Sequence, residues 1–300
     1  VITSEYPHSI FVVFKNNVPV GRAVLYENPH LSYLSHRSAC VGNYDCINEE
    51  PSSQLLLSAV KERAQKNGFT FLLGPMNGST WETYRWSTAH HHPPFLSEPV
   101  HPLYYNTQWE HAGFQVISHY HSYLDSEMTH DFPKVIQKER TFQQMGMTFE
   151  SINLSSFESE LTALYPLMCR AFANNFLYTP ISESYFVKKH NNLLPLIQPQ
   201  WTIKAVDHNG NIKGIILSFP DGLNPNQKSL IVKTLLTDPT DRKWAGLGSV
   251  LCNQIVRRAS KAGFTSVISA FMHSSNVSLN IAKNFQSTPY KHYILMGSEI

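Results

Sequence analysis

The hydrophobic positions along the chain alternate between helical and strand spacing. From Leu247 to Ala262, apolar residues recur every three or four positions, which predicts a helix that buries one face. Gly263 follows where a helix end favours a left-handed residue. The apolar residues Val267 and Ile268 then predict a buried strand. This part of the chain is therefore predicted to place a helix on a sheet.

The same pattern occurs twice. A shift of 195 positions places Gln54–Thr70 on Ser249–Thr265 without a gap, and seven of these seventeen positions are identical. Each copy reads as a helix, a Gly-Phe-Thr turn and a short strand, so the chain is predicted to contain two copies of one α/β unit. The identical pairs are Leu56/Leu251, Arg63/Arg258, Ala64/Ala259, Lys66/Lys261, Gly68/Gly263, Phe69/Phe264 and Thr70/Thr265.

A hairpin precedes the helix of each copy. Ile10–Phe14 and Val20–Tyr26 are predicted strands in the first copy, and Trp201–Val206 and Lys213–Phe219 in the second. The second hairpin carries Asn209-Gly210, a strong turn signal. Each copy thus runs strand, strand, strand, helix, strand, helix, strand.

The second copy has two further predicted helices before its hairpin, within Phe157–Phe172 and Phe186–Ile197. The first copy has too little chain for both, so its N-terminus is expected to be abbreviated. A polar helix over Pro133–Met147 separates the copies. We predict an α/β fold with mixed sheets in two tandem domains, residues 1–128 and 149–300, joined by a linker helix at 129–148.

Composition limits the classes of function. Charged residues make up 15% and the formal net charge is +2, so the chain lacks the strong positive potential that attracts nucleic acid. No apolar run reaches the roughly 20 residues that span a bilayer, and the four cysteines lack zinc or disulfide spacing. His90-His91-His92 has no suitably spaced partner, so no metal site is expected. We expect a cytoplasmic protein with neither a membrane nor a nucleic-acid partner.

A glycine-containing turn is the clearest chemical signal. The predicted strand Leu230–Leu236 leads through a loop to Lys243–Gly248, where the helix begins. Gly246 and Gly248 let a ligand approach the backbone, and a helix N-terminus attracts an anion, so the turn suits a pyrophosphate. Neither a P-loop nor a dinucleotide fingerprint fits the spacing, because no Lys-Ser/Thr follows and Leu251 occupies the third glycine position.

The sequence here resembles the GCN5-related N-acetyltransferase (GNAT) superfamily. The run Lys243-Trp-Ala-Gly246-Leu-Gly248 is similar to its phosphate loop, [RQ]xxGx[GA], with lysine in the first position. The resemblance implies that acetyl-CoA is the co-substrate and lies along the preceding strand. It also implies contacts from Leu235, Leu236, Thr237, Lys243, Trp244, Ala245, Gly246, Leu247, Gly248, Ser249 and Asn276.

Two other segments narrow the resemblance. Gly74–Glu82 (GPMNGSTWE) and Asn175–Phe186 (NFLYTPISESYF) are similar to a bacterial family of tandem acetyltransferase-like proteins. The first copy departs from the phosphate-loop pattern, because Pro51-Ser52-Ser53 stands in its place after the acidic Glu49-Glu50. Proline removes an N–H and carboxylates repel a pyrophosphate, so the first copy is predicted not to bind CoA. Ser52 and Ser53 are expected to cap its helix.

The resemblance also implies direct transfer of an acyl group to an amine. A backbone N–H near Leu235–Thr237 would stabilise the oxyanion, and a base would take the amine proton. His273, at the end of a predicted strand, is the candidate base. The superfamily's usual acid, a tyrosine, corresponds to Lys283, which leaves Tyr290 and Tyr293 as candidates.

The predicted function is therefore acyl-CoA-dependent N-acyltransfer to a small-molecule or amino-acid-like amine by the second copy. One alternative is a non-catalytic CoA- or ligand-binding module, which Lys243 and Lys283 favour because they replace the superfamily's usual residues. Another is aminoacyl transfer from charged tRNA, since such transferases use paired copies of this fold. The low basic charge argues against tRNA as a partner.

Overall fold

The computed structural model describes residues 5–275, 281–282 and 285–300. The chain divides into two compact units. Unit 1 comprises the described residues up to Tyr120, with Asn175–Thr179 and Lys291–Ile300; unit 2 comprises those of His121–Asn174 and Pro180–Tyr290. Among the described residues, no helix is both long and apolar enough to cross a bilayer.

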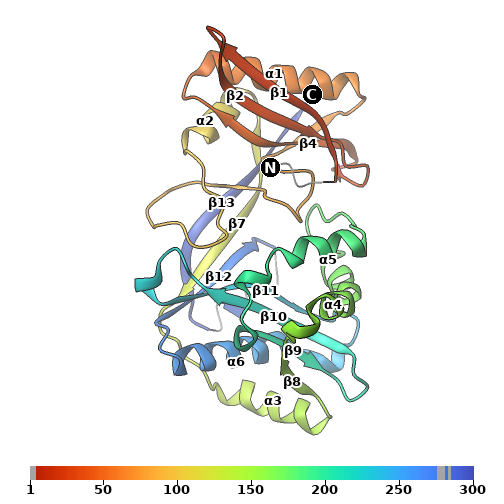
Figure 1. Ribbon diagram of the computed structural model, residues 1–300, viewed down its shortest axis with the longest axis vertical. Helices are drawn as coiled ribbons and strands as arrows, with labels where there is room; N and C mark the ends of the chain where they lie inside the picture. The colour runs from red at the N-terminus through yellow and green to blue at the C-terminus, as the bar shows by residue number, and fades with distance from the viewer. Residues whose placement is uncertain (1–4, 276–280, 283–284) are drawn as a thin grey trace. The chain divides into compact units, whose positions relative to one another are not determined.

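Unit 1 is a mixed sheet with a helix on one face. Its strands follow the order β1-β2-β4-β5-β13, with β4 and β5 parallel and the other neighbours antiparallel. Helix α1 lies across β1, β2 and β4 (Figure 1) and buries Leu57 and Val60 against Leu25 and Val41. The elements are β1 (Pro7–Lys15), β2 (Val18–Tyr26), β3 (Ser32–Tyr33), β4 (His36–Cys46), α1 (Glu50–Lys66), β5 (Phe71–Gly74), β6 (Trp86–Ser87), α2 (Tyr104–His111), β7 (Gln115–Asp125) and β13 (Thr288–Glu299).

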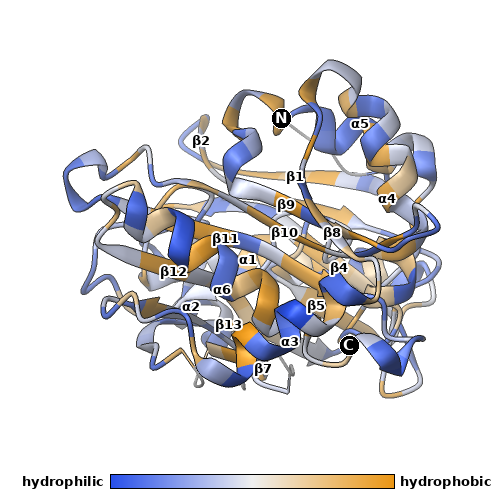
Figure 2. Cartoon of the chain, turned by 90° about the horizontal axis from the view of Figure 1, so that it is seen from below, coloured by the Kyte–Doolittle hydropathy of each residue, from blue (hydrophilic) through white to orange (hydrophobic). Residues whose placement is uncertain are grey.

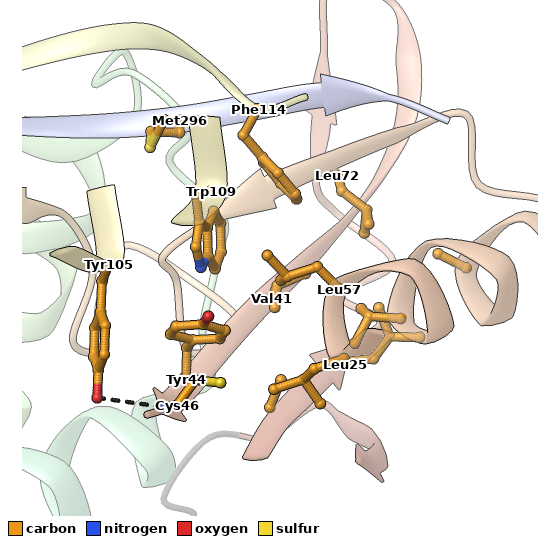
Figure 3. Close-up of a cluster of buried hydrophobic side chains, with 14 of the residues drawn as sticks. Leu25, Val41, Tyr44, Cys46, Leu57, Leu72, Tyr105, Trp109, Phe114 and Met296 are labelled. Atoms are coloured by element: carbon orange, nitrogen blue, oxygen red, sulfur yellow. Dashed lines mark hydrogen bonds between the residues drawn. The ribbon is translucent and has the colours of Figure 1, made fainter. Parts of the chain in front are cut away.

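Aromatic side chains of unit 1 form part of its core (Figure 3). Trp109 of α2 is fully buried, and the centroid of its ring lies 5.6 Å from that of Tyr44 in an edge-on contact. Tyr105 is also buried, and its hydroxyl donates to Asp45 at 2.6 Å. Edge-on pairs stabilise a core beyond the area that they bury. These rings therefore hold α2 to β4 by packing.

Unit 2 is a mixed sheet with helices on both faces. Its strands follow the order β12-β11-β10-β9-β8, with β11 and β12 parallel. On β10, Gly214 faces Leu247 and Leu251 of α6, whereas Leu217 lies on the face covered by α4 and α5. The elements are α3 (Pro133–Gln144), β8 (Thr148–Ser151), α4 (Phe157–Phe172), α5 (Glu183–Asn191), β9 (Thr202–Val206), β10 (Ile212–Pro220), β11 (Ser229–Thr237), α6 (Leu247–Lys261) and β12 (Ser266–His273).

Helix α3, predicted from the polar segment between the copies, packs on α6. Both helices carry hydrophobic and hydrophilic residues (Figure 2), and Phe142 of α3 is buried in the core that α6 shares. The carboxylate of Glu139 accepts two bonds from Arg257 Nη2, at 3.0 and 3.1 Å, and one from Gln254 at 3.0 Å. A buried carboxylate needs such partners, so this cluster fixes how α3 lies on α6.

The repeat seen in the sequence is confirmed by matching hydrogen bonds. Phe69 N donates to Ala64 O at 3.1 Å, and Phe264 N donates to Ala259 O at 3.0 Å, in each case just after a glycine with φ near +80°. The next residue also donates in each copy, Thr70 N to Arg37 O in β4 and Thr265 N to Lys228 O just before β11. The identical Gly-Phe-Thr segments thus end two equivalent helices.

The units differ from the predicted domain ranges at several segments. Residues 121–128 and the predicted linker at 129–148 belong to unit 2. Lys291–Ile300 of β13 belongs to unit 1, where Met296 pairs with Gly74 of β5. Asn175–Thr179 also belongs to unit 1, where Thr179 O accepts a bond from Trp81 Nε1 at 2.9 Å. The two segments behind the narrower resemblance therefore meet each other. These assignments depend on contacts between residues far apart in the chain, which local sequence patterns do not specify.

Candidate active site

Strands β11 and β12 pair over only part of their length. The pairing begins at Ser229 and Ser266 and ends at Val232 and Ser269, although both strands continue. On its other edge β11 pairs with β10, where Leu217 faces Thr234 and the next residue, Ser218, faces Val232. Lys233 is thus an extra, unpaired residue of the ladder, which forms a bulge. Such a bulge bends a strand and increases its twist. The second half of β11, Thr234–Thr237, therefore diverges from β12 and leaves one backbone edge open.

The opposite wall of this gap contains a strained residue. Phe271 of β12 has φ +61°, in the left-handed region that a bulky side chain rarely adopts. Its N–H donates to Ser122 Oγ at 3.4 Å, and Lys233 Nζ lies 4.6 Å from the centroid of its ring. Strained residues often occur at functional sites. The sequence analysis did not identify Lys233 or Phe271, because neither a bulge nor a positive φ has a signature in these residue types.

The predicted phosphate turn is exposed and preorganised. Gly246 has φ +92° and is the N-cap of α6, and both it and Ala245 are exposed. The first helical N–H groups, those of Leu247 and Gly248, have no intrahelical acceptor, as at every helix start. The side chains of Trp244 and Leu247 are buried, so these two residues can reach a ligand only through the backbone. This arrangement fits a diphosphate, the group that the sequence predicts here.

Asp238 anchors the loop between β11 and this turn. Its buried carboxylate accepts bonds from Thr240 N (3.1 Å), Thr240 Oγ1 (2.6 Å) and Arg170 Nη2 of α4 (3.1 Å). Burial raises the pKa of Asp238, but the bonds from Thr240 and Arg170 outweigh that effect and hold the pKa below its ordinary value. The carboxylate is thus charged at neutral pH and fixes the start of the loop.

Two lysines approach the turn. Lys243 Nζ lies 3.3 Å from Asp241 Oδ2 and 4.9 Å from the ring centroid of Trp244. Lys138 of α3 donates to Ala245 O at 2.8 Å, and its side chain covers the space beside Gly246. A cation there adds to the positive end of the helix. Lys138 was absent from the sequence prediction, because α3 is remote from the turn in sequence.

The other predicted site residues lie in both units. His273 ends β12 in unit 2, and its Nδ1 lies 2.7 Å from Ser275 Oγ. Tyr290 is half-buried in the part of β13 that belongs to unit 2. Tyr293 is fully buried in unit 1 and donates to Glu98 Oε1 at 2.8 Å. Asn276 and Lys283 lie outside the described residues.

The remaining predicted contacts follow the turn and the strand. Leu235 and Thr237 point toward Gly248, since a Cβ on that glycine would lie within 4 Å of both side chains. Leu236 is buried on the opposite side of β11, and Ser249 is half-buried in the first turn of α6. The strand and the turn thus meet at Gly248, where a substituent would also contact Ile281 at 3.0 Å.

The equivalent region of unit 1 is filled by its own chain. Strands β4 and β5 pair only from Ser38/Phe71 to Cys40/Leu73. Beyond them Met76 N donates to Val41 O at 2.8 Å, and a Cβ on Gly42 would lie 2.5 Å from Met76 O. The segment after β5 therefore occupies the place that stays open beside β11.

The helix start in unit 1 also differs from that of unit 2. The N-cap of α1 is Glu49, not Ser52 or Ser53 as expected from the sequence, and Ser52 donates to Glu49 Oε2 at 2.7 Å. The helix begins earlier than predicted because Pro51 is well placed in a first turn. A carboxylate thus lies at the position where a phosphate would bind.

Comparison with known proteins identifies the fold. No family model and no curated protein matches the sequence. A GCN5-related N-acetyltransferase from Sphaerobacter thermophilus is 12% identical, with a TM-score of 0.55 over 95% of this chain and 78% of that chain. A tandem GNAT protein from the clavulanic acid biosynthesis pathway, solved without AcCoA, is 13% identical, with a TM-score of 0.54 over 97% and 82%.

A third solved structure also aligns along nearly the whole chain. It is the GCN5-related glucosamine N-acetyltransferase region of a fungal multi-domain GH3 β-N-acetylglucosaminidase, 13% identical, with a TM-score of 0.56. The alignment covers 94% of this chain but only 32% of that one. These likenesses show that the chain has the tandem GNAT fold, as the resemblance in its sequence predicts.

Proposed function

We propose, on the premise that this chain has the GNAT fold in tandem, that unit 2 is an acyl-CoA-dependent N-acyltransferase. The observation that carries the proposal is the exposed turn at Gly246, which starts α6 directly beside the open edge of β11. A donor with a diphosphate and an extended arm needs both features. The substrate class that we propose is a small-molecule or amino-acid-like amine, with acetyl-CoA as donor.

The turn would hold the diphosphate through the N–H groups of Leu247 and Gly248, assisted by Lys138. The thioester supplies an activated acyl carbon. Backbone N–H groups of Leu235–Thr237 are candidates to stabilise the oxyanion, because β12 does not pair with this stretch. His273 stays the proposed base and Tyr290 the proposed acid. Tyr293 is not proposed for unit 2, because it is buried in unit 1 and donates to Glu98.

Unit 1 is proposed to be the half without a donor site. Its gap beside β4 is filled by Met76 and its neighbours, and Glu49 lies at the start of α1. Both features oppose a diphosphate, one by occupying space and the other by charge.

The test compares one substitution at the two ends of α6. Gly246→Ala introduces a Cβ at φ +92°, which strains the turn. Gly263→Ala is the matched control, since Gly263 has φ +82° and no atom within 4 Å of the new Cβ. Calorimetry with CoA should show at least tenfold weaker binding for Gly246→Ala and unchanged binding for Gly263→Ala.

Equal affinity of both variants for CoA would contradict the proposed site. If CoA binds as expected, release of free thiol from acetyl-CoA with a panel of amines separates an enzyme from a non-catalytic CoA-binding module. A chain that binds CoA but releases no thiol with any amine would favour the module.

A further inference from the structure

The turn that begins α6 has the backbone dihedrals of a type II turn. Ala245 has φ −58° and ψ 123°, and Gly246 has φ +92° and ψ 3°. The type II values are about (−60°, +120°) and (+80°, 0°), with a positive φ at the second residue. A type I turn follows a similar path with its central peptide reversed, and its second residue has a negative φ. The peptide between Ala245 and Gly246 can therefore adopt two orientations.

The observed orientation presents Gly246 N–H to a ligand. In a planar trans peptide the C=O and the N–H point in opposite directions. Ala245 O accepts a bond from Lys138 Nζ at 2.8 Å, so Gly246 N–H points away from Lys138. Among the described residues this N–H has no hydrogen-bond acceptor. It is thus available on the side of the turn that α3 leaves open.

Lys138 lies against the turn along much of its side chain. A Cβ on Gly246 would lie 2.6 Å from Lys138 Nζ and 2.7 Å from Cδ. The lysine therefore covers one side of Gly246 while its ammonium group binds Ala245 O. A bond from a charged donor is stronger than one between neutral groups. Reversal of the peptide would break this bond and turn Gly246 N–H, a positive dipole end, toward a cation.

The backbone of α3 is anchored on both sides of Lys138. The next residue, Glu139, is buried and accepts bonds from Arg257 Nη2 of α6 at 3.0 and 3.1 Å. One helical turn after Lys138, the buried ring of Phe142 meets that of Trp244 edge-on, with centroids 5.5 Å apart. The lysine thus extends from a fixed backbone, and its reach to Ala245 O follows from how α3 packs on α6.

We propose that Lys138 is a positioning residue of the donor site, which fixes the peptide between Ala245 and Gly246. The N–H of Gly246 then joins those of Leu247 and Gly248 in binding the diphosphate. The inference rests on the proposed function. It makes the linker helix α3 part of the donor site, although α3 lies outside the repeated unit.

The first experiment examines the free protein by NMR after labelling of its glycines with nitrogen-15. The amide signal of Gly246 is identified by its loss in Gly246→Ala. Lys138→Met removes the donor at similar length and should move this signal, whereas Lys138→Arg keeps a cationic donor and should leave it close to its original position. The control is Lys134→Met, an exposed lysine one turn earlier in α3, which should not move the signal.

The second experiment measures CoA binding by calorimetry. Lys138→Met should weaken binding at least about tenfold, whereas Lys138→Arg and Lys134→Met should stay within about fivefold of the unsubstituted protein. In assays of thiol release, Lys138→Met should raise the KM of acetyl-CoA by about the same factor and leave kcat within about twofold, because the peptide acts on donor binding.

The outcomes separate this role from others. Equal loss of CoA affinity in Lys138→Met and Lys134→Met would overturn it, because charge alone would then explain the effect. Weaker CoA binding with an unmoved Gly246 signal would also overturn it, since Lys138 would then contact the phosphate directly. Failure of the unsubstituted protein to bind CoA would contradict the proposed function, whereas an unmoved Gly246 signal in Lys138→Met contradicts only the role of Lys138.

Discussion

His101 is a buried histidine in unit 1, stacked on Trp86 with ring centroids 5.3 Å apart. Burial, and to a lesser extent the nearby His90, lowers the pKa of His101 from 6.5 to about 4. The ring is therefore neutral in the folded protein at physiological pH, because charging it would cost solvation.

This shift predicts a loss of stability in mild acid. Between pH 6.5 and about 4 the unfolded chain binds a proton that folded His101 does not, so the free energy of unfolding falls as the pH is lowered through this window. The total loss should be roughly 3 kcal/mol. In urea titrations at several pH values, His101→Phe should weaken this dependence of the free energy of unfolding on pH, whereas the exposed control His91→Phe should leave it unchanged. The same loss of stability in acid for both variants would show that His101 does not cause it.

At the scale of elements, Asp238 connects β11, the loop to α6 and, through Arg170, helix α4. Because its folded pKa is lowered, its contribution to stability is present above the unfolded value of 3.8 and is lost as the pH falls through the folded pKa. Asp238→Asn should cost about 1–3 kcal/mol, because it removes the carboxylate that pairs with Arg170.

The matched control for Asp238 is Asp221→Asn, at the other end of the β10–β11 hairpin, where the carboxylate accepts bonds from Leu223 N and Asn224 Nδ2 in its own turn. Both variants should lose some stability in urea titrations. Only Asp238→Asn should also weaken CoA binding, since it loosens the start of the phosphate loop. Equal effects of the two variants on CoA affinity would show that Asp238 does not position the turn.

Elements with a strong local signature were predictable from the sequence. Helix α6 and the hairpin β9–β10 lie where periodicity and the Asn209-Gly210 turn place them. The backbone of the turn at Gly246 was predictable, because glycine is the residue that adopts φ +92° most easily. The bulge at Lys233 and the backbone of Phe271 were not, since tertiary contacts impose them.

At the scale of the molecule, each copy has a sheet with one equivalent helix on it, but only the second copy has a second layer of helices. In unit 2, α4 and α5 cover the face of β10 that carries Leu217. In unit 1, the corresponding side of β1 exposes Ile10, Val12 and Phe14, which alternate along the strand with residues that pack on α1. A layer equivalent to α4 and α5 of unit 2 is thus absent from the described part of unit 1.

One chain is expected to have a single donor site. The gap beside β4 is closed by Met76 N donating to Val41 O, and Asn43 N donates to Asn77 Oδ1 at 2.8 Å. Within the described residues of unit 1, β4 thus has no open edge for a donor arm. Calorimetry should therefore give one CoA per chain, and Gly246→Ala should weaken all of that binding at least tenfold rather than half of it. Two sites, or one that survives in Gly246→Ala but is lost in Ser52→Pro, would place a donor in unit 1. The two copies have the same Gly-Phe-Thr segment at the end of the helix but differ at its start. A single CoA site would therefore show that donor binding depends on the start of the helix and on an open strand edge, and not on the fold alone.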